Sequence, residues 1–95
     1  MKTFAVTYAY DAQTSLRDEV RPRHRAFLSG LYAAGVLLAS GPVTSGASQG
    51  ALIIVKAEDE ASALALLDND PFVIEGTVAE RQAVEWTPVF GPWTP

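Results

Sequence analysis

The chain has 95 residues, a length that fits one domain over residues 1–95, and 48% of them are hydrophobic. It contains no cysteine, which excludes disulfides, thiolate nucleophiles and cysteine-bound metals and favours a cytoplasmic protein. Its net charge of −4 argues against nucleic acid as the main partner, because phosphate contacts need clustered Lys and Arg.

The first predicted element is a strand over residues 4–10. Large side chains at Phe4, Val6, Tyr8 and Tyr10 alternate there with small or polar ones. This apolar stretch is shorter than a signal peptide needs, and no run in the sequence approaches the roughly 18 apolar residues of a membrane span. We therefore expect a cytoplasmic protein with no membrane partner.

Residues 16–34 show a helical period. Apolar side chains, with one histidine among them, recur at helical spacing and form a single stripe: Val20, His24, Phe27, Leu28 and Leu31. A proline is tolerated in a first helical turn, so Pro22 predicts that the main helix begins near Arg21. Residues 15–20 are then a separate turn or a kinked lead-in, and Gly35 ends the helix.

A second predicted strand covers residues 36–40 and is stopped by Gly41-Pro42. The Ser- and Gly-rich stretch 44–50 is predicted to be a loop. Residues 51–55 form a continuous apolar run, which indicates a third strand that is buried on both faces.

Asp59 is predicted to cap a second helix that extends to about residue 68, and Pro71 is predicted to break this helix at Asp70. A last strand is expected around residues 83–86, followed by an irregular tail over residues 91–95. The order is β-α-β-β-α-β, which predicts an α+β fold with a four-stranded antiparallel sheet and both helices on one face.

Two helices can cover only one face of such a sheet. Because the strand at 51–55 is apolar on both faces, we predict that the helix-free face packs against the same face of a second copy. The sequence therefore predicts a homodimer.

His24 is the one histidine, and it lies on the apolar stripe. It is either a core histidine with both nitrogens hydrogen-bonded or a general acid or base in an apolar pocket. Asp70, in the Asp-Pro corner, either stops the helix for local reasons or orients His24. Contact between the two side chains would favour the catalytic alternative for both residues.

Arginines at four nearby positions make a local basic cluster that we interpret as a helix face or a small-anion site: Arg17, Arg21, Arg23 and Arg25. Arg21 lies one turn before His24 and is the candidate clamp for a carboxylate or phenolate, the alternative being a solvated surface charge. Ser40 offers a hydroxyl for substrate binding.

The sequence contains no Gly-rich phosphate loop, no convincing zinc set and no G-x-S-x-G elbow, so no cofactor or metal is predicted.

The chain resembles the YCII-like family (YciI-related proteins) in a series of short motifs that are spaced as in the family: Arg21-Pro22-Arg23-His24, Gly35-Val36-Leu37-Leu38-Ala39-Ser40-Gly41-Pro42, Gly50-Ala51-Leu52-Ile53-Ile54, Asp70-Pro71-Phe72 and Trp86. The resemblance implies a ferredoxin-like fold and a dimeric α/β barrel built from two facing sheets. It also implies a His–Asp pair as the active site, which carries over onto His24 and Asp70, with Arg21 as the arginine of the family's R-x-x-H pattern.

The resemblance leaves the reaction open. Some relatives are dehydrochlorinases of chlorinated aromatic compounds, and related barrels are lactone isomerases and monooxygenases. We expect a cofactor-independent enzyme that uses His24 and Asp70 for acid–base chemistry on a small cyclic or aromatic acid, in the manner of a dehydrochlorinase, isomerase or lyase. The alternative is a non-catalytic dimeric module that binds a small molecule or serves as an accessory subunit. A purely structural fold without a pocket is the third interpretation.

Overall fold

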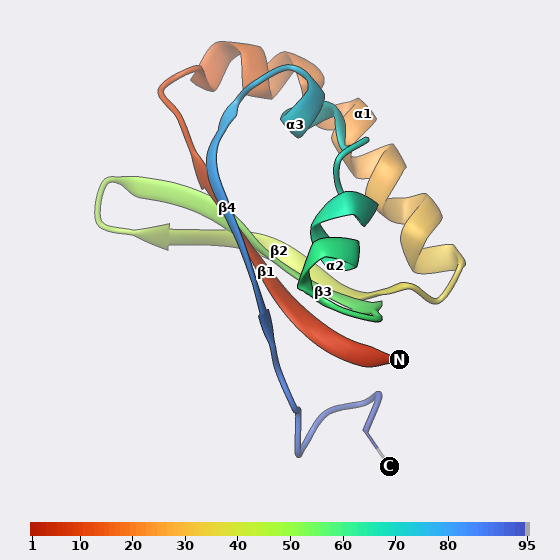
Figure 1. Ribbon diagram of the computed structural model, residues 1–95. Helices are drawn as coiled ribbons and strands as arrows, with labels where there is room; N and C mark the ends of the chain where they lie inside the picture. Colours follow the sequence, from red (N-terminus) through yellow and green to blue (C-terminus); the bar gives the residue numbers. More distant parts are fainter. Residues whose placement is uncertain (95) are drawn as a thin grey trace.

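The computed structural model describes residues 1–94 and has an α+β fold. Its elements follow in the order β1 (Lys2–Tyr10), α1 (Thr14–Ala33), β2 (Leu37–Ser45), β3 (Ser48–Ala57), α2 (Glu60–Leu66), α3 (Pro71–Ile74) and β4 (Val78–Glu85). The strands form one antiparallel sheet in the order β2-β3-β1-β4, and the helices all lie on one of its faces (Figure 1). The predicted layout is thereby confirmed.

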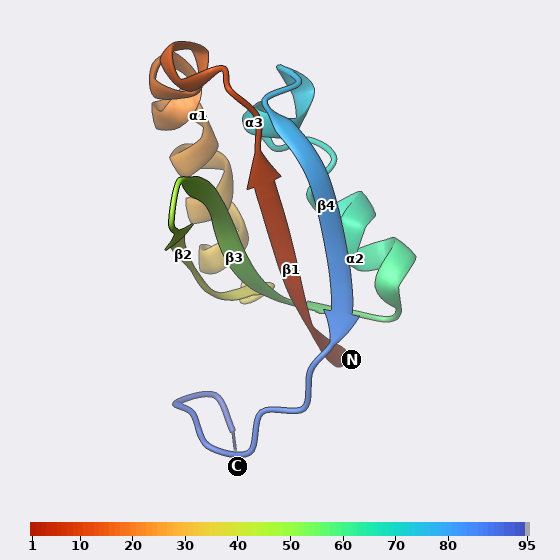
Figure 2. The ribbon, with the colours of Figure 1, turned by 90° about the vertical axis from the view of Figure 1, so that its left-hand side faces the viewer.

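The core lies between the sheet and the helices. In β1 the side chains of Phe4, Val6 and Tyr8 are buried and face the helices, while the residues between them face the other side. Figure 2 looks at that other face, which no helix covers. No helix therefore contributes to the surface of this helix-free face.

Helix α1 is one continuous helix from Thr14 to Ala33, so the predicted start near Arg21 is wrong. Pro22 lies inside the helix, where it removes one main-chain hydrogen bond. The turns before it are held by tertiary packing, because Arg17 and Val20 are both buried. These contacts stabilise a segment that local propensity alone would leave as a lead-in.

Strands β2 and β3 are longer than predicted and form a hairpin. The predicted stop at Gly41-Pro42 lies within β2, and most of the predicted loop 44–50 is strand. Strand β2 is an edge of the sheet and pairs only with β3, so the missing N–H of Pro42 can be tolerated on its outer side. The tight turn contains Gly46 at a φ of 60°, a conformation that suits glycine.

The second half of the chain matches the prediction more closely. Asp59 caps α2 by accepting a hydrogen bond from the N–H of Ser62 at 2.8 Å, although α2 ends at Leu66. Pro71 does not end that helix; it is the first residue of α3. Trp86 follows β4 directly, and no helix or strand forms in residues 87–94 (Figure 2). Pro95, the last residue of the predicted tail, lies outside the described residues.

Gly50 provides a test of how closely β1 and β3 pack. A Cβ atom at this position would overlap the main-chain carbonyl of Tyr8. We expect Gly50→Ala to lower the free energy of unfolding by about 1–3 kcal/mol, because the backbone of β1 must shift. Urea denaturation measures the effect. The control is Gly30→Ala in α1, where no atom lies within 4 Å of the new methyl group and the gain in helix propensity should raise stability. Equal effects from the two substitutions would contradict the prediction.

Candidate active site

A cavity of about 530 Å³ opens between α1, α3 and the β2–β3 hairpin. A pocket of this size can hold a small ring compound. The side chains that line it and carry polar or aromatic groups include Tyr10, Arg21, His24, Arg25, Ser40 and Phe72. Helix α1 supplies the cationic wall, and the hairpin supplies the opposite wall with neutral residues only.

His24 and Asp70 are in direct contact at this cavity. The ring Nδ1 of His24 lies 2.7 Å from Oδ1 and 2.9 Å from Oδ2 of Asp70. Asp70 is fully buried and His24 is 8% exposed. Because an ionised carboxylate only accepts hydrogen bonds, Nδ1 is the ring nitrogen that donates to Asp70, and Nε2 is the nitrogen left for a bound molecule. Among residues 1–94, Nε2 has no hydrogen-bond partner.

Tyr8 is the third side chain of this buried network. Its hydroxyl donates to Oδ2 of Asp70 at 2.9 Å. Burial, and then the neighbouring charge of Asp70, raises the pKa of Tyr8, so this hydroxyl stays protonated and remains a donor. The sequence pattern placed Tyr8 among the large side chains on one face of the first strand. The structure places it in the core, where it holds the carboxylate that contacts His24.

Asp70 and Phe72 together fix the imidazole ring. Asp70 is the N-cap of α3, and it accepts a hydrogen bond from the N–H of Phe72 at 3.0 Å. The ring of Phe72 stacks on that of His24, with centroids 3.8 Å apart and planes 6° from parallel. The hydrogen bond to Asp70 fixes which edge of the imidazole points inward, and stacking on Phe72 fixes the plane of the ring. The sequence signal for a site role of Phe72 is its position two residues after Asp70, beside the Asp-Pro corner.

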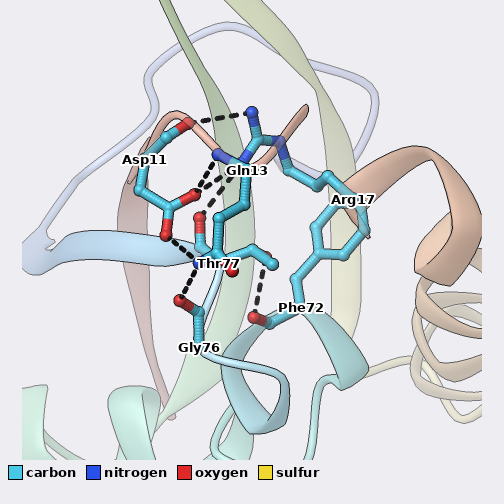
Figure 3. Close-up of polar contacts among 6 residues, drawn as sticks. All are labelled: Asp11, Gln13, Arg17, Phe72, Gly76 and Thr77. Carbon is cyan, nitrogen blue, oxygen red and sulfur yellow. Dashed lines mark hydrogen bonds and ion pairs between the residues drawn. The ribbon is translucent and has the colours of Figure 1, made fainter. Parts of the chain in front are cut away.

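A second polar cluster joins the first turn of α1 to the end of α3 (Figure 3). Buried Arg17 donates to the carboxylate of Asp11 at 3.1 Å, to the main-chain oxygen of Asp11 at 3.0 Å and to that of Thr77 at 3.3 Å. The hydroxyl of Thr77 donates in turn to the main-chain oxygen of Phe72 at 2.9 Å. Hydrogen bonds from Gln13 lower the pKa of Asp11 and keep it ionised beside Arg17. This cluster fixes α3 against α1 and thereby positions Phe72.

The predicted basic cluster is therefore not a single anion site. Arg17 is a buried structural residue, and Arg23 lies on the exposed side of α1, 3.8 Å from Glu75. Arg21 and Arg25 line the cavity. The helical period places Arg17 and Arg21 on the stripe side of the helix and Arg23 off it.

Arg21 and Ser40 both line the cavity, and within residues 1–94 neither forms a hydrogen bond with His24. The guanidinium of Arg21 donates to Asp18 at 2.5 Å and lies 5.8 Å from the centroid of the Phe72 ring. Ser40 lines the opposite wall from β2. Of the four predicted site residues, the structure thus joins His24 with Asp70 and leaves the two predicted substrate contacts at separate walls.

Within residues 1–94, no group of three or more His, Asp or Glu side chains is arranged to hold a metal ion. No helix in this range is long and apolar enough to cross a membrane.

The comparisons with known proteins agree on the fold. The family model of the YCII-related domain matches residues 1–87. A solved structure of 5-chloro-2-hydroxyhydroquinone dehydrochlorinase from Burkholderia phenoliruptrix, in complex with 2,5-dihydroxybenzoquinone, is similar with a TM-score of 0.73 at 22% identity, covering 90% of this chain and 93% of that one. An antibiotic biosynthesis monooxygenase is similar with a TM-score of 0.56 at 14% identity, covering 94% and 99%. Among curated proteins, no sequence matches the chain.

Proposed function

This chain belongs to the YCII-related family, and from that premise we propose that it is a cofactor-independent enzyme that moves a proton to or from a small cyclic or aromatic acid. The observation that carries the proposal is the contact between buried Asp70 and His24 at the wall of a cavity of about 530 Å³. Such a pair needs no metal or organic cofactor, because a positioned imidazole is itself the acid or base.

The geometry of the cavity supports a proposed role for each of these residues. Nε2 of His24 is the atom that exchanges a proton with the substrate. Asp70 holds the opposite ring nitrogen, fixes the tautomer and stabilises the imidazolium that forms. Arg21 binds an anionic oxygen of the substrate, and Ser40 offers a hydroxyl from the facing wall.

The similar dehydrochlorinase suggests a first substrate to try. Loss of HCl from 5-chloro-2-hydroxyhydroquinone releases one chloride and one proton and leaves a hydroxybenzoquinone. His24 would accept the proton that leaves oxygen or carbon as the chloride departs. The proposal therefore covers eliminations and isomerisations in which a proton moves at an oxygenated ring.

The test is an anaerobic assay of chloride release from 5-chloro-2-hydroxyhydroquinone, with 2,5-dihydroxybenzoquinone as a competitor. We expect release that the competitor suppresses. A second assay follows deuterium uptake from D₂O into hydroxyquinones that carry no chlorine, which detects proton transfer without elimination. Binding of these compounds with neither reaction would overturn the enzyme proposal and favour the non-catalytic binding module.

We also propose that the protein is a homodimer formed by the helix-free face of the sheet. This face carries exposed apolar side chains from three strands and the residue after β4: Val43, Leu52, Val84 and Trp86, which are 46%, 38%, 46% and 40% exposed. An apolar sheet face of this kind is stabilised when it is covered. A second copy offers the same complementary surface.

Sedimentation velocity tests the dimer. We expect a dimer at micromolar concentration and a monomer for Leu52→Glu, because a carboxylate at the centre of the interface would be buried without a partner. The control is Tyr32→Glu, which changes a side chain that is 65% exposed on α1 and should remain dimeric. A wild-type monomer at micromolar concentration would overturn the proposed dimer.

A further inference from the structure

One arginine of the cavity has no carboxylate beside it. The chain has five arginines, and four of them lie close to an acidic oxygen, at 3.1, 2.5, 3.8 and 2.8 Å for Arg17, Arg21, Arg23 and Arg81 respectively. Within residues 1–94, Arg25 is the arginine that forms no ion pair. It is also one of the residues that line the cavity.

The charge of the cavity wall is opposite to that of the whole protein. The net charge of the chain is −4, yet Arg21 and Arg25 line the cavity together with His24, and no Asp or Glu does. Asp70 lies behind the imidazole and is fully buried. A bound molecule therefore meets cationic groups on the α1 side and neutral groups on the hairpin side.

The two cavity arginines repel each other weakly when the cavity holds no anion. Arg21 and Arg25 are four residues apart on α1, a spacing at which like charges repel. Asp18 offsets the charge of Arg21. Arg25 is exposed to solvent, and within residues 1–94 no carboxylate pairs with it. An anionic ligand group beside Arg25 would remove the imbalance and gain a charge-assisted hydrogen bond.

We propose that the cavity binds a ring compound with two anionic oxygen groups, one held by Arg21 and the other by Arg25. Arg25 is then a specificity-determining residue that selects dianions over monoanions. His24 lines the same cavity as the two arginines, and its Nδ1 is held by Asp70, so Nε2 is the ring nitrogen left for the bound ring. This inference rests on the proposed function only in taking the cavity as the substrate site.

Calorimetric titration near neutral pH and low salt tests the selection. The dianionic probe is 2,5-dihydroxybenzoquinone, whose two hydroxyls are both acidic, and the monoanionic probe is its 2-hydroxy-5-methoxy analogue. We expect Arg25→Gln to weaken binding of the dianion about tenfold or more and to change binding of the monoanion less than about twofold. The matched control is Arg23→Gln, which removes the same charge from the same helix at a position outside the cavity lining.

Two results would overturn the inference. Equal weakening of dianion binding by Arg25→Gln and Arg23→Gln would mean that the ligand responds only to the overall positive charge of the helix. Equal loss for both probes, or no binding of the dianion to the wild type, would mean that Arg25 does not select a second anionic group. Because the titration measures no turnover, selective binding without catalysis would refute the enzyme proposal alone, and turnover that is indifferent to Arg25→Gln would refute this inference alone.

Discussion

Turnover of the chlorinated hydroxyhydroquinone is expected to fall by about 10²–10⁴-fold when His24 is replaced by asparagine. The amide nitrogen of asparagine can take the place of Nδ1 and still donate to Asp70, which accepts from the histidine at 2.7 Å. The variant has no counterpart of Nε2, so it has no group that can exchange a proton with the substrate. Steady-state chloride release measures the loss.

Two controls accompany this substitution. Thermal unfolding should show that the variant is folded, and 2,5-dihydroxybenzoquinone should still bind, because Arg21 and Arg25 remain. A folded His24→Asn variant that keeps turnover within about tenfold of the wild type would remove the imidazole from the mechanism.

Loss of the Asp70 carboxylate should be the most damaging single change to stability. Asp70 accepts hydrogen bonds from the hydroxyl of Tyr8, the ring of His24 and the main chain of Phe72, and it is fully buried. In Asp70→Ala these donors lose their acceptor without access to water. We expect the free energy of unfolding to fall by about 3–5 kcal/mol, measured by urea denaturation.

Asp68 is the matched control for this measurement. Its side chain is 56% exposed and pairs with Arg81 at 2.8 Å, so Asp68→Ala should cost about 1 kcal/mol or less. If Asp70→Ala does not fold, Asp70→Asn keeps the shape and one acceptor and should give an intermediate loss. A cost at position 70 no larger than that at position 68 would show that the buried network does not stabilise the fold.

The sequence predicted the order of the four strands and the two longer helices from local periods, apolar runs and turn residues, but not the short helix α3. It misplaced boundaries where packing outweighs local preference. Pro22 predicted a helix start, yet buried Arg17 extends α1 by two turns before it. Gly41-Pro42 predicted a stop, yet an edge strand accommodates both residues. Neither outcome can be read from residues that are adjacent in sequence.

Some features of the candidate site could be predicted from local sequence patterns, and others could not. The stripe that contains His24 and the Asp-Pro corner at Asp70 are both local patterns. Contact between the two residues could be predicted as possible because both helices were expected on the same face of the sheet. Tyr8 lies 62 positions from Asp70 along the chain, and their hydrogen bond depends on the register of β1 beneath α3. The division of the arginines into structural, exposed and cavity-lining positions also required the three-dimensional packing.

The N-cap at Asp70 would tie the evolution of the proposed chemistry to that of the fold. One carboxylate begins α3 and also contacts the imidazole, so no substitution at this position could change the proposed reaction while leaving the scaffold untouched. New activities in this lineage are therefore most accessible through Arg21, Arg25 and the β2–β3 hairpin, which border the cavity without belonging to the buried network. Natural variation should concentrate at those walls and spare the corner behind the histidine.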